Sequence, residues 1–380
     1  MKPDGSYCQT YRNKILARSK LLSMLLLYPI SRLYGLGVAV RNKMFEYGML
    51  KQQEFDIPIV VVGNLAMGGT GKTPHVEYIV ESLLGRYNVG VLSRGYKRAT
   101  KGFVLATPQS RPEDIGDESY QIYRKFGPDI TLAVCEKRTE GITKMREINP
   151  KLDIIILDDA FQHRYVKPWA SVILTEYNRP VFMDKLLPYG RLRESPRALN
   201  RAEIVIVTKC PPGMKAMDYR LFEENLKLFP YQKLYFSRYN YGHLVPVFPE
   251  EAPDIPSLDA RSTDTSVLVI TGVANPKPFV RFLRRQKLKV KLKRFTDHHN
   301  FTSSDMEEIS RLFDGLTAKR KFIVTTEKDA VRILNNPYFP HHLKKSIFYV
   351  PIKVEFIDRG EPDFTSGLEK TIRDSRLFKA

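Results

Sequence analysis

At 380 residues the chain is long enough for two domains, and its 43% hydrophobic and 11% aromatic residues are typical of a globular protein. These values argue against a disordered or low-complexity chain. The 61 Lys and Arg outnumber the 42 Asp and Glu, and the formal net charge of +19 predicts an anionic partner: nucleic acid, an anionic membrane or a phosphorylated small molecule. Three cysteines without metal-binding spacing argue against a disulfide framework and favour a reducing compartment.

The first fifty residues mix cations with apolar side chains. Residues 11–50 contain seven basic residues and one acid, Glu46. The apolar run over residues 21–30 is broken by Ser23 and Pro29, and the chain nowhere reaches the ~18 consecutive apolar residues of a membrane-spanning helix. By its residues alone the segment suits two placements equally well. One is a membrane surface, with apolar groups buried and cations at the lipid phosphates. The alternative is a pair of N-terminal helices packed on the first domain.

The clearest motif is a glycine-rich loop. Residues 57–63 form an apolar, β-branched run that predicts a buried parallel strand, and a helical pattern covers residues 72–84. The loop between this strand and this helix, together with the first two residues of the helix, supplies the nucleotide-binding candidates. These are Ala66, Met67, Gly68, Gly69, Thr70, Gly71, Lys72 and Thr73. This order is that of a Walker A motif, whose backbone N–H groups and helix N-terminus bind phosphate. Lys72 would reach the β- and γ-phosphates of ATP and Thr73 the Mg²⁺; Ala66 stands where the strict pattern has glycine.

A second apolar run, residues 154–157, ends in the two acids Asp158 and Asp159. A carboxylate at the end of a strand is the Walker B arrangement, which faces the Mg²⁺ of a bound nucleotide. Many strands end in Asp at an ordinary turn, so the pair is informative because it follows a Walker A motif. We expect a carboxylate of this pair to face the Mg²⁺.

Seven further short motifs accompany the phosphate loop. In chain order they are SRGY (93–96), GDE (116–118), DDAFQHR (158–164), GRLRE (190–194), TGVANP (271–276), FTDHHNF (295–301) and TTEKDA (325–330). With GGTGKTP (68–74) at the front, the series resembles the tetraacyldisaccharide 4′-kinase family of the lipid A pathway, over residues 20–355. A P-loop by itself indicates a nucleotide and no particular acceptor, so the resemblance is what suggests the acceptor.

The resemblance implies an activity and a location. Members of the family transfer the γ-phosphate of ATP, with Mg²⁺, to the 4′-hydroxyl of a tetraacylated glucosamine disaccharide 1-phosphate. They act at the cytoplasmic face of the bacterial inner membrane, where residues 11–50 of this chain would form the anchor. Neither nucleic acid nor an obligate protein partner is expected.

The resemblance also implies roles for single residues. The catalytic residues would be Asp117, its partner His298 from the second domain, and Lys72. The metal ligands would be Thr73, Asp158, Asp159 and Glu118, and the substrate contacts Arg94, Gln162, His163, Arg193 and Glu194. The residue types alone leave alternatives open, because Asp117 also suits a helix N-cap and His298 an ordinary loop position. Each substrate contact could equally form a surface ion pair.

Strands and helices alternate along the first domain, which predicts a P-loop α/β/α domain with a doubly wound, mostly parallel sheet. A smaller α/β/α domain follows, joined by a two-stranded linker. The expected division is 1–50 for the membrane-surface segment, 51–230 for the kinase core, 231–245 for a linker strand, 246–345 for the smaller domain, and 346–380 for a returning strand and C-terminal tail. A single returning strand is expected over residues 347–354, and a single helix over residues 115–126.

Residues 281–294 hold eight cations and no acid. The lysines alternate with Leu288, Val290 and Leu292, a pattern typical of an edge strand, and no motif that reads nucleic acid accompanies them. We expect a solvated face or a second membrane contact. The alternative function for the whole chain is a P-loop ATPase that acts as a switch on a membrane or nucleic acid. A kinase needs His298 to be delivered over the phosphates by the second domain, whereas a switch does not.

Overall fold

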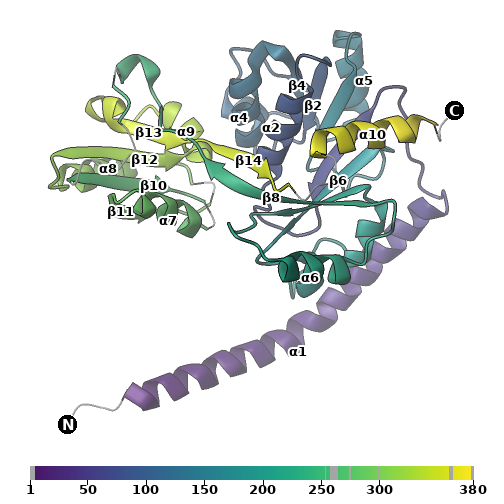
Figure 1. Cartoon of the computed structure of the whole chain (residues 1–380), viewed down its shortest axis with the longest axis horizontal. Coiled ribbons are helices and arrows are strands. Elements are labelled where there is room, and N and C mark those ends of the chain that lie inside the picture. Colours follow the sequence, from purple (N-terminus) through teal and green to yellow (C-terminus); the bar gives the residue numbers. More distant parts are fainter. Residues whose placement is uncertain are drawn as a thin grey trace.

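The computed structural model describes most of the chain as a large lobe, a small lobe and a long N-terminal helix (Figure 1). The structure describes residues 5–252, 254–256, 264–273, 275–297, 299–358 and 363–377. It describes side chains from residue 26 to residue 375 within these ranges. His298, an expected catalytic residue, therefore lies outside the described residues.

The large lobe is built on a nine-stranded, mostly parallel sheet with helices on both faces (Figure 1). In spatial order its strands are β14 (Ile352–Phe356), β8 (Lys233–Tyr241), β7 (Ile204–Thr208), β6 (Ala170–Glu176), β1 (Ile59–Asn64), β5 (Ile154–Asp158), β2 (Val89–Ser93), β4 (Ile130–Val134) and β3 (Val104–Leu105). Its helices are α2 (Lys72–Leu83), α3 (Pro112–Ile115), α4 (Asp117–Phe126), α5 (Arg138–Ile148), α6 (Ala216–Leu226) and α10 (Phe364–Leu377), with 3₁₀ turns at η1 (Gly127–Asp129), η2 (Val181–Met183) and η3 (Pro196–Arg201).

The central strand β1 explains why this sheet is buried on both faces. Ile59 and Val61 belong to the apolar cluster on one face, and Val60 and Val62 to the cluster on the other. All six residues of β1 are buried, as expected for a parallel strand covered by helices on both sides. The β1 and β5 strands pair directly, so their carboxyl ends, which carry the Walker motifs, meet at one edge.

The small lobe has a five-stranded sheet in the order β11 (Lys289–Arg294), β10 (Thr265–Thr271), β12 (Arg320–Thr326), β13 (Ile347–Val350), β9 (Val245–Pro246). Around it lie α7 (Lys277–Arg285), α8 (Ser303–Asp314), α9 (Glu327–Leu334), η4 (Pro249–Glu251) and η5 (His341–Ser346). The lysine-rich strand β11 is at the edge of this sheet, as its sequence predicts. The antiparallel strands β8 and β14 run between the lobes (Figure 1).

Three elements differ from the sequence prediction. The expected single strand over 347–354 is two strands, because Pro351 interrupts the ladder between β13 in the small sheet and β14 in the large one. The expected helix over 115–126 breaks at Gly116, whose φ of 85° is unfavourable for residues with a side chain. The C-terminal tail forms the helix α10, which packs on the large lobe beside β6.

The N-terminal segment is one helix, α1 (Gly5–Glu46), and not the helix pair considered above. Its N-terminal part extends beyond both lobes, and its C-terminal part lies along the large lobe (Figure 1). There the Ser31 hydroxyl donates to the Leu186 carbonyl at 2.9 Å and Phe45 is buried. A Cβ on Gly35 would lie 2.6 Å from the Leu186 side chain, so glycine permits this close approach. In the described part of the chain, no helix has the length and apolar character needed to cross a membrane.

Candidate active site

The phosphate loop has a backbone that depends on glycine. Gly68 has a φ of 108° and Gly71, the N-cap of α2, a φ of 98°, values that disfavour other residues. A Cβ on Gly71 would also lie 2.1 Å from the Tyr239 hydroxyl oxygen of β8. The loop is therefore shaped both by its own glycines and by a strand that leads to the small lobe.

Hydrogen bonds from neighbouring segments hold the loop. The Asn64 side chain donates to the Thr70 hydroxyl at 2.6 Å, and Thr208 donates to the Thr70 carbonyl at 2.8 Å. The Met67 N–H donates to the Arg191 carbonyl at 2.7 Å. Contacts to residues on both sides of the loop restrict its movement, which is what a preorganised anion site requires.

The N-terminus of α2 is free to receive an anion. It has no side-chain N-cap bond and no acidic residue in its first turn, which contains Lys72 and Thr73. The first N–H groups of a helix have no partner within the helix, and the helix dipole places partial positive charge there. This end of α2 therefore suits the phosphates of a nucleotide.

Lys72 belongs to a charged network at the carboxyl edge of the sheet. Its Nζ lies 3.5 Å from Asp159 Oδ2 and donates to Asn64 Oδ1 at 3.4 Å. Arg193 Nη1 donates to Asp159 Oδ1 at 3.2 Å and to Gln162 Oε1 at 3.3 Å. Burial alone would raise the pKa of Asp159, but Lys72 and Arg193 outweigh it and lower the pKa below its usual range. Asp159 is thus held ionised as a bridge between two cations.

Asp158 has a different environment from its neighbour. It is buried, and burial together with the Asp159 charge raises its pKa to about 7. Its Oδ1 has no hydrogen-bond partner, although it is buried. Among the described residues no three His, Cys, Asp or Glu side chains form a metal cluster. Mg²⁺ in kinases needs one or two carboxylates beside phosphate and water, so the unpartnered Oδ1 of Asp158 fits such an ion.

Asp117 and Glu118 begin α4, and both contact the small lobe. Asp117 forms an ion pair with Arg332 of α9, whose Nε lies 3.2 Å from Asp117 Oδ2, and Glu118 Oε1 lies 3.5 Å from Lys328 Nζ. Glu118 also acts electrostatically on Asp158, so α4 lies close to the Walker B acids. The structure therefore brings two of the expected acids to the junction between the lobes.

His163 lies among cations. Burial and then the charges of Arg138, Arg41 and Arg94 lower its pKa to about 4, so the ring is neutral near pH 7. Arg94, which follows β2, is exposed. Arg41 donates from α1 to the Gln162 carbonyl at 3.3 Å. Of the expected substrate residues, His163 and Arg94 thus lie in a cationic region, to which Arg41 of α1 contributes.

Glu194 faces α1 and η3. It is 2% exposed, and its Oε2 accepts hydrogen bonds from Asn42 at 2.7 Å and from Arg201 at 2.8 Å. The Tyr34 hydroxyl of α1 donates to the Arg193 carbonyl at 2.9 Å. The GRLRE segment therefore connects α1 to the network around Lys72.

Sequence reasoning missed the residues that act across long distances in the chain. Lys328 lies within the TTEKDA motif, and Arg332 follows two residues after it. The signal available in the sequence was that these two residues are cations whereas Asp117 and Glu118, which they contact, are acids. Lys209 donates to the Gly69 carbonyl, and nothing in the local sequence pattern indicates this contact. Tyr239 lies in a strand that was expected as a plain linker.

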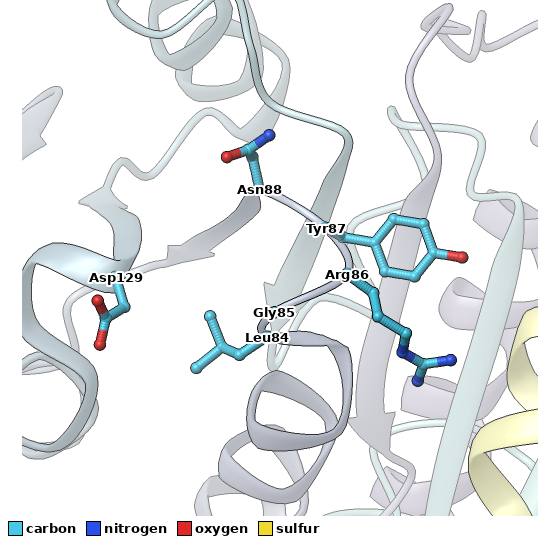
Figure 2. A pocket seen from close by; sticks show the side chains of 6 residues that line it. All are labelled: Leu84, Gly85, Arg86, Tyr87, Asn88 and Asp129. Atoms are coloured by element: carbon cyan, nitrogen blue, oxygen red, sulfur yellow. The ribbon is translucent and has the colours of Figure 1, made fainter.

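A surface hollow lies away from this site. Figure 2 shows it at the loop after α2, with Leu84, Arg86 and Asn88 on one side and Asp129 on the other. It is at the opposite end of α2 from the phosphate loop, where the strands begin. Ligands of open α/β sheets bind at the carboxyl ends of the strands, so the hollow is not part of the candidate active site.

Comparison with known proteins covers almost the whole chain. The family model of the tetraacyldisaccharide-1-P 4′-kinase, LpxK, matches residues 23–373. The chain belongs to this family. The tetraacyldisaccharide 4′-kinases of Bacteroides thetaiotaomicron and Bacteroides fragilis are 46% identical over 355 residues and 47% identical over 351 residues. Each match covers 92% of this chain and 93% of the relative.

The fold is similar to a solved member of the family. The crystal structure of LpxK from Aquifex aeolicus in complex with ATP matches with a TM-score of 0.69 and 25% sequence identity, covering 93% of this chain and 99% of that one. The family resemblance and the P-loop α/β architecture expected from the motifs are thereby confirmed. The domain boundaries and the roles of single residues stay predictions.

Proposed function

We propose that this chain transfers the γ-phosphate of ATP to the 4′-hydroxyl of a tetraacylated glucosamine disaccharide 1-phosphate in lipid A biosynthesis, with Mg²⁺ as cofactor. The observation that carries the proposal is a phosphate loop with a free helix N-terminus beside Lys72 and Asp158, in a chain that belongs to the 4′-kinase family. The geometry supports the phosphate donor, and the family supports the acceptor.

The chemistry divides among the residues by position. The acceptor oxygen bonds to the γ-phosphorus while the bond from that phosphorus to the bridging oxygen breaks, and ADP leaves. We assign the hydroxyl proton to Asp117, with His298 as its partner. Lys72 binds the β- and γ-phosphates and stabilises the charge that moves onto the leaving group. Mg²⁺ held by Asp158 and Thr73, with Asp159 and Glu118 nearby, would neutralise phosphate oxygens.

The acceptor is anionic, and the cationic surface beside the Walker B strand suits it. Arg94, His163 and Arg193 come from the large lobe and Arg41 from α1, and arginine binds phosphate in a bidentate manner. The neutral ring of His163 can donate or accept a hydrogen bond at a sugar hydroxyl. Gln162 and Glu194 orient this surface through their contacts with Arg193 and Asn42.

The exposed face of α1 suits a membrane surface. Leu26, Ile30, Leu33, Leu36 and Val40 are 52–69% exposed and recur at helical spacing on one side of the helix. The other side docks on the large lobe, so the apolar stripe points away from the protein. An exposed apolar stripe on a protein with a net charge of +19 fits an anionic lipid surface, from which the acylated substrate would be taken. We place the protein at the cytoplasmic face of the bacterial inner membrane as part of this proposal, because the family resemblance implies it.

The proposal is tested by following ATP and lipid together in detergent. With ATP, Mg²⁺ and a tetraacylated disaccharide 1-phosphate, mass spectrometry should show a gain of one phosphate on the lipid, in step with ADP release. Lys72→Ala should lower the rate about 100-fold or more, because it removes the cation at the phosphates. The matched control Lys151→Ala changes an exposed lysine away from the site and should not alter the rate. ATP turnover with unmodified lipid would instead favour an ATPase switch.

A further inference from the structure

Helix α9 is fixed firmly to the small lobe. Asp329, in its first turn, is 1% exposed, and its Oδ2 accepts hydrogen bonds from Thr271 and the Gly272 N–H at 3.0 Å and from Thr326 at 2.7 Å. These bonds join the start of the helix to the carboxyl ends of β10 and β12. Because a helix is stiff over eight residues, the face of α9 that points away from the small lobe moves with that lobe as one body.

From this helix two cations reach the large lobe. Lys328 and Arg332 are four residues apart and therefore lie on one face of α9, which packs against α4 (Figure 1). Lys328 pairs with Glu118, and Arg332 pairs with Asp117 through Nε and Nη2. The Arg332 and Asp117 side chains are 9% and 14% exposed, so water screens this pair far less than a surface ion pair.

Arg332 has a further partner in the small lobe. Its Nη1 donates to the carbonyl of His299 at 3.3 Å, and His299 directly follows His298 in the chain. One guanidinium therefore contacts the expected catalytic carboxylate on α4 and the backbone of the segment that carries the expected partner histidine. A planar group with several fixed donors can hold two acceptors in a defined relation, whereas the single ammonium of lysine cannot.

The geometry points to Arg332 as a positioning residue for phosphoryl transfer. It holds the Asp117 carboxylate and the His299 backbone in register when the small lobe lies against the large one, and it takes no proton, because arginine stays charged in proteins. This assignment rests on the proposed kinase function, in which Asp117 receives the proton. Lys328 and Glu118 form a second contact beside it and keep the two helices aligned.

The test compares two substitutions of Arg332 with the loss of an ion pair at the far end of the large lobe. Arg332→Gln is expected to lower kcat about 100-fold, the cost of a misplaced catalytic group, while KM for ATP stays the same because the phosphate loop is untouched. Arg332→Lys keeps the positive charge but lacks the planar set of guanidinium donors, and its kcat should fall about tenfold. The control Arg86→Gln breaks the 2.7 Å ion pair with Glu369 at the far end of α2 and should leave kcat unchanged.

Rates are expressed per ATP-binding site, so that misfolded protein does not count. The assignment is supported if kcat falls from the wild type to Arg332→Lys and further to Arg332→Gln while the affinity for ATP stays constant. Loss of ATP binding in step with activity would mean a purely structural role and would overturn it, as would a kcat for Arg332→Gln within about twofold of the wild type.

Amide hydrogen exchange tests the contact without any substrate. In Arg332→Gln the amides of α4 and α9 should exchange faster than in Arg86→Gln, because the bond between the lobes is lost. If the wild type does not phosphorylate the lipid, the proposed function is wrong. Hydrogen exchange then still tests whether Arg332 joins the two lobes. Faster exchange supports the bridge between the lobes, and unchanged exchange overturns it.

Discussion

His75 shows how a single buried group supports the phosphate loop. Its Nδ1 lies 2.7 Å from the Gly71 carbonyl and its Nε2 2.8 Å from the Ser237 hydroxyl. A carbonyl can only accept, so Nδ1 carries the proton and Nε2 accepts from Ser237. Burial lowers the pKa of His75 to about 4, which keeps the ring neutral under physiological conditions. The loop and strand β8 are thereby joined through a neutral imidazole.

This lowered pKa predicts a pH dependence of stability. Between pH 6.5 and 4 the unfolded chain binds a proton at His75 that the folded chain does not, so the free energy of unfolding falls as the pH falls. For this group the loss from pH 7 to pH 5 is about 2 kcal/mol. His75→Gln can make both hydrogen bonds without titrating and should reduce the pH dependence by that amount. Urea unfolding followed by fluorescence of Trp169, the single tryptophan, measures it; an identical pH dependence in both proteins would contradict the assignment.

At the scale of elements, α1 has two faces with different tasks. One face is tied to the large lobe through Tyr34, Arg41 and Asn42, which contact segments carrying the expected substrate residues. The opposite face exposes an apolar stripe. A helix that contacts the substrate surface and presents apolar groups outward can hold that surface next to lipid.

Substituting the stripe should weaken membrane binding without unfolding the protein. The triple variant Leu26→Asn, Leu33→Asn and Val40→Asn removes three side chains that are 52–69% exposed. Co-sedimentation with vesicles containing anionic lipid should weaken about tenfold or more, because each side chain loses its burial in the bilayer interface.

The matched control for the stripe is Ile148→Asn, Met217→Asn and Leu221→Asn. These side chains are 51–74% exposed on α5 and α6, so the control removes as much apolar surface from other elements. It should bind vesicles as the wild type does. If both triple variants bound vesicles equally well, the proposed membrane role of α1 would be wrong.

At the scale of the whole molecule, a cluster of charges lies where α4 of the large lobe meets α9 of the small lobe, and Glu77 is its buried member. Glu77 of α2 accepts hydrogen bonds from Gln121 and Lys125 of α4, each at 2.8 Å. Glu327, the first residue of α9, lies close enough that burial and the Glu77 charge raise its pKa to about 7. Lys125 is therefore the cation shared by carboxylates from both lobes.

Removing this cation should destabilise the protein. Lys125→Met leaves Glu77 buried without its charge partner and should lower the free energy of unfolding by about 3 kcal/mol at pH 8. The loss should shrink as the pH falls to 5, because Glu327, with a pKa raised to about 7, is protonated there and no longer repels Glu77. Adding Glu77→Gln to Lys125→Met should restore part of the lost free energy of unfolding. Lys144→Met, which breaks an exposed pair with Glu140, is the control and should have little effect in urea unfolding. A loss that did not depend on pH would contradict this account.

The sequence by itself determined the local features of this protein. The phosphate loop, the Walker B strand and the alternation of strands and helices are each encoded within about 30 residues, so periodicity and motif spacing reveal them. The family resemblance followed from the order of short motifs, and the family match confirmed it. Edge strand β11 was likewise predictable, because its alternating lysines are a local pattern.

The tertiary structure decided which distant residues meet. Arg332 contacts Asp117 across 215 positions of sequence, and Tyr239 of β8 lies against Gly71, contacts that depend on strand order and on how the lobes face each other. The split of Asp158 and Asp159 into a buried acid of raised pKa and an ionised bridge has the same origin. Neighbouring residues of one type differ here because burial and nearby charge, which no local pattern specifies, set their pKa values.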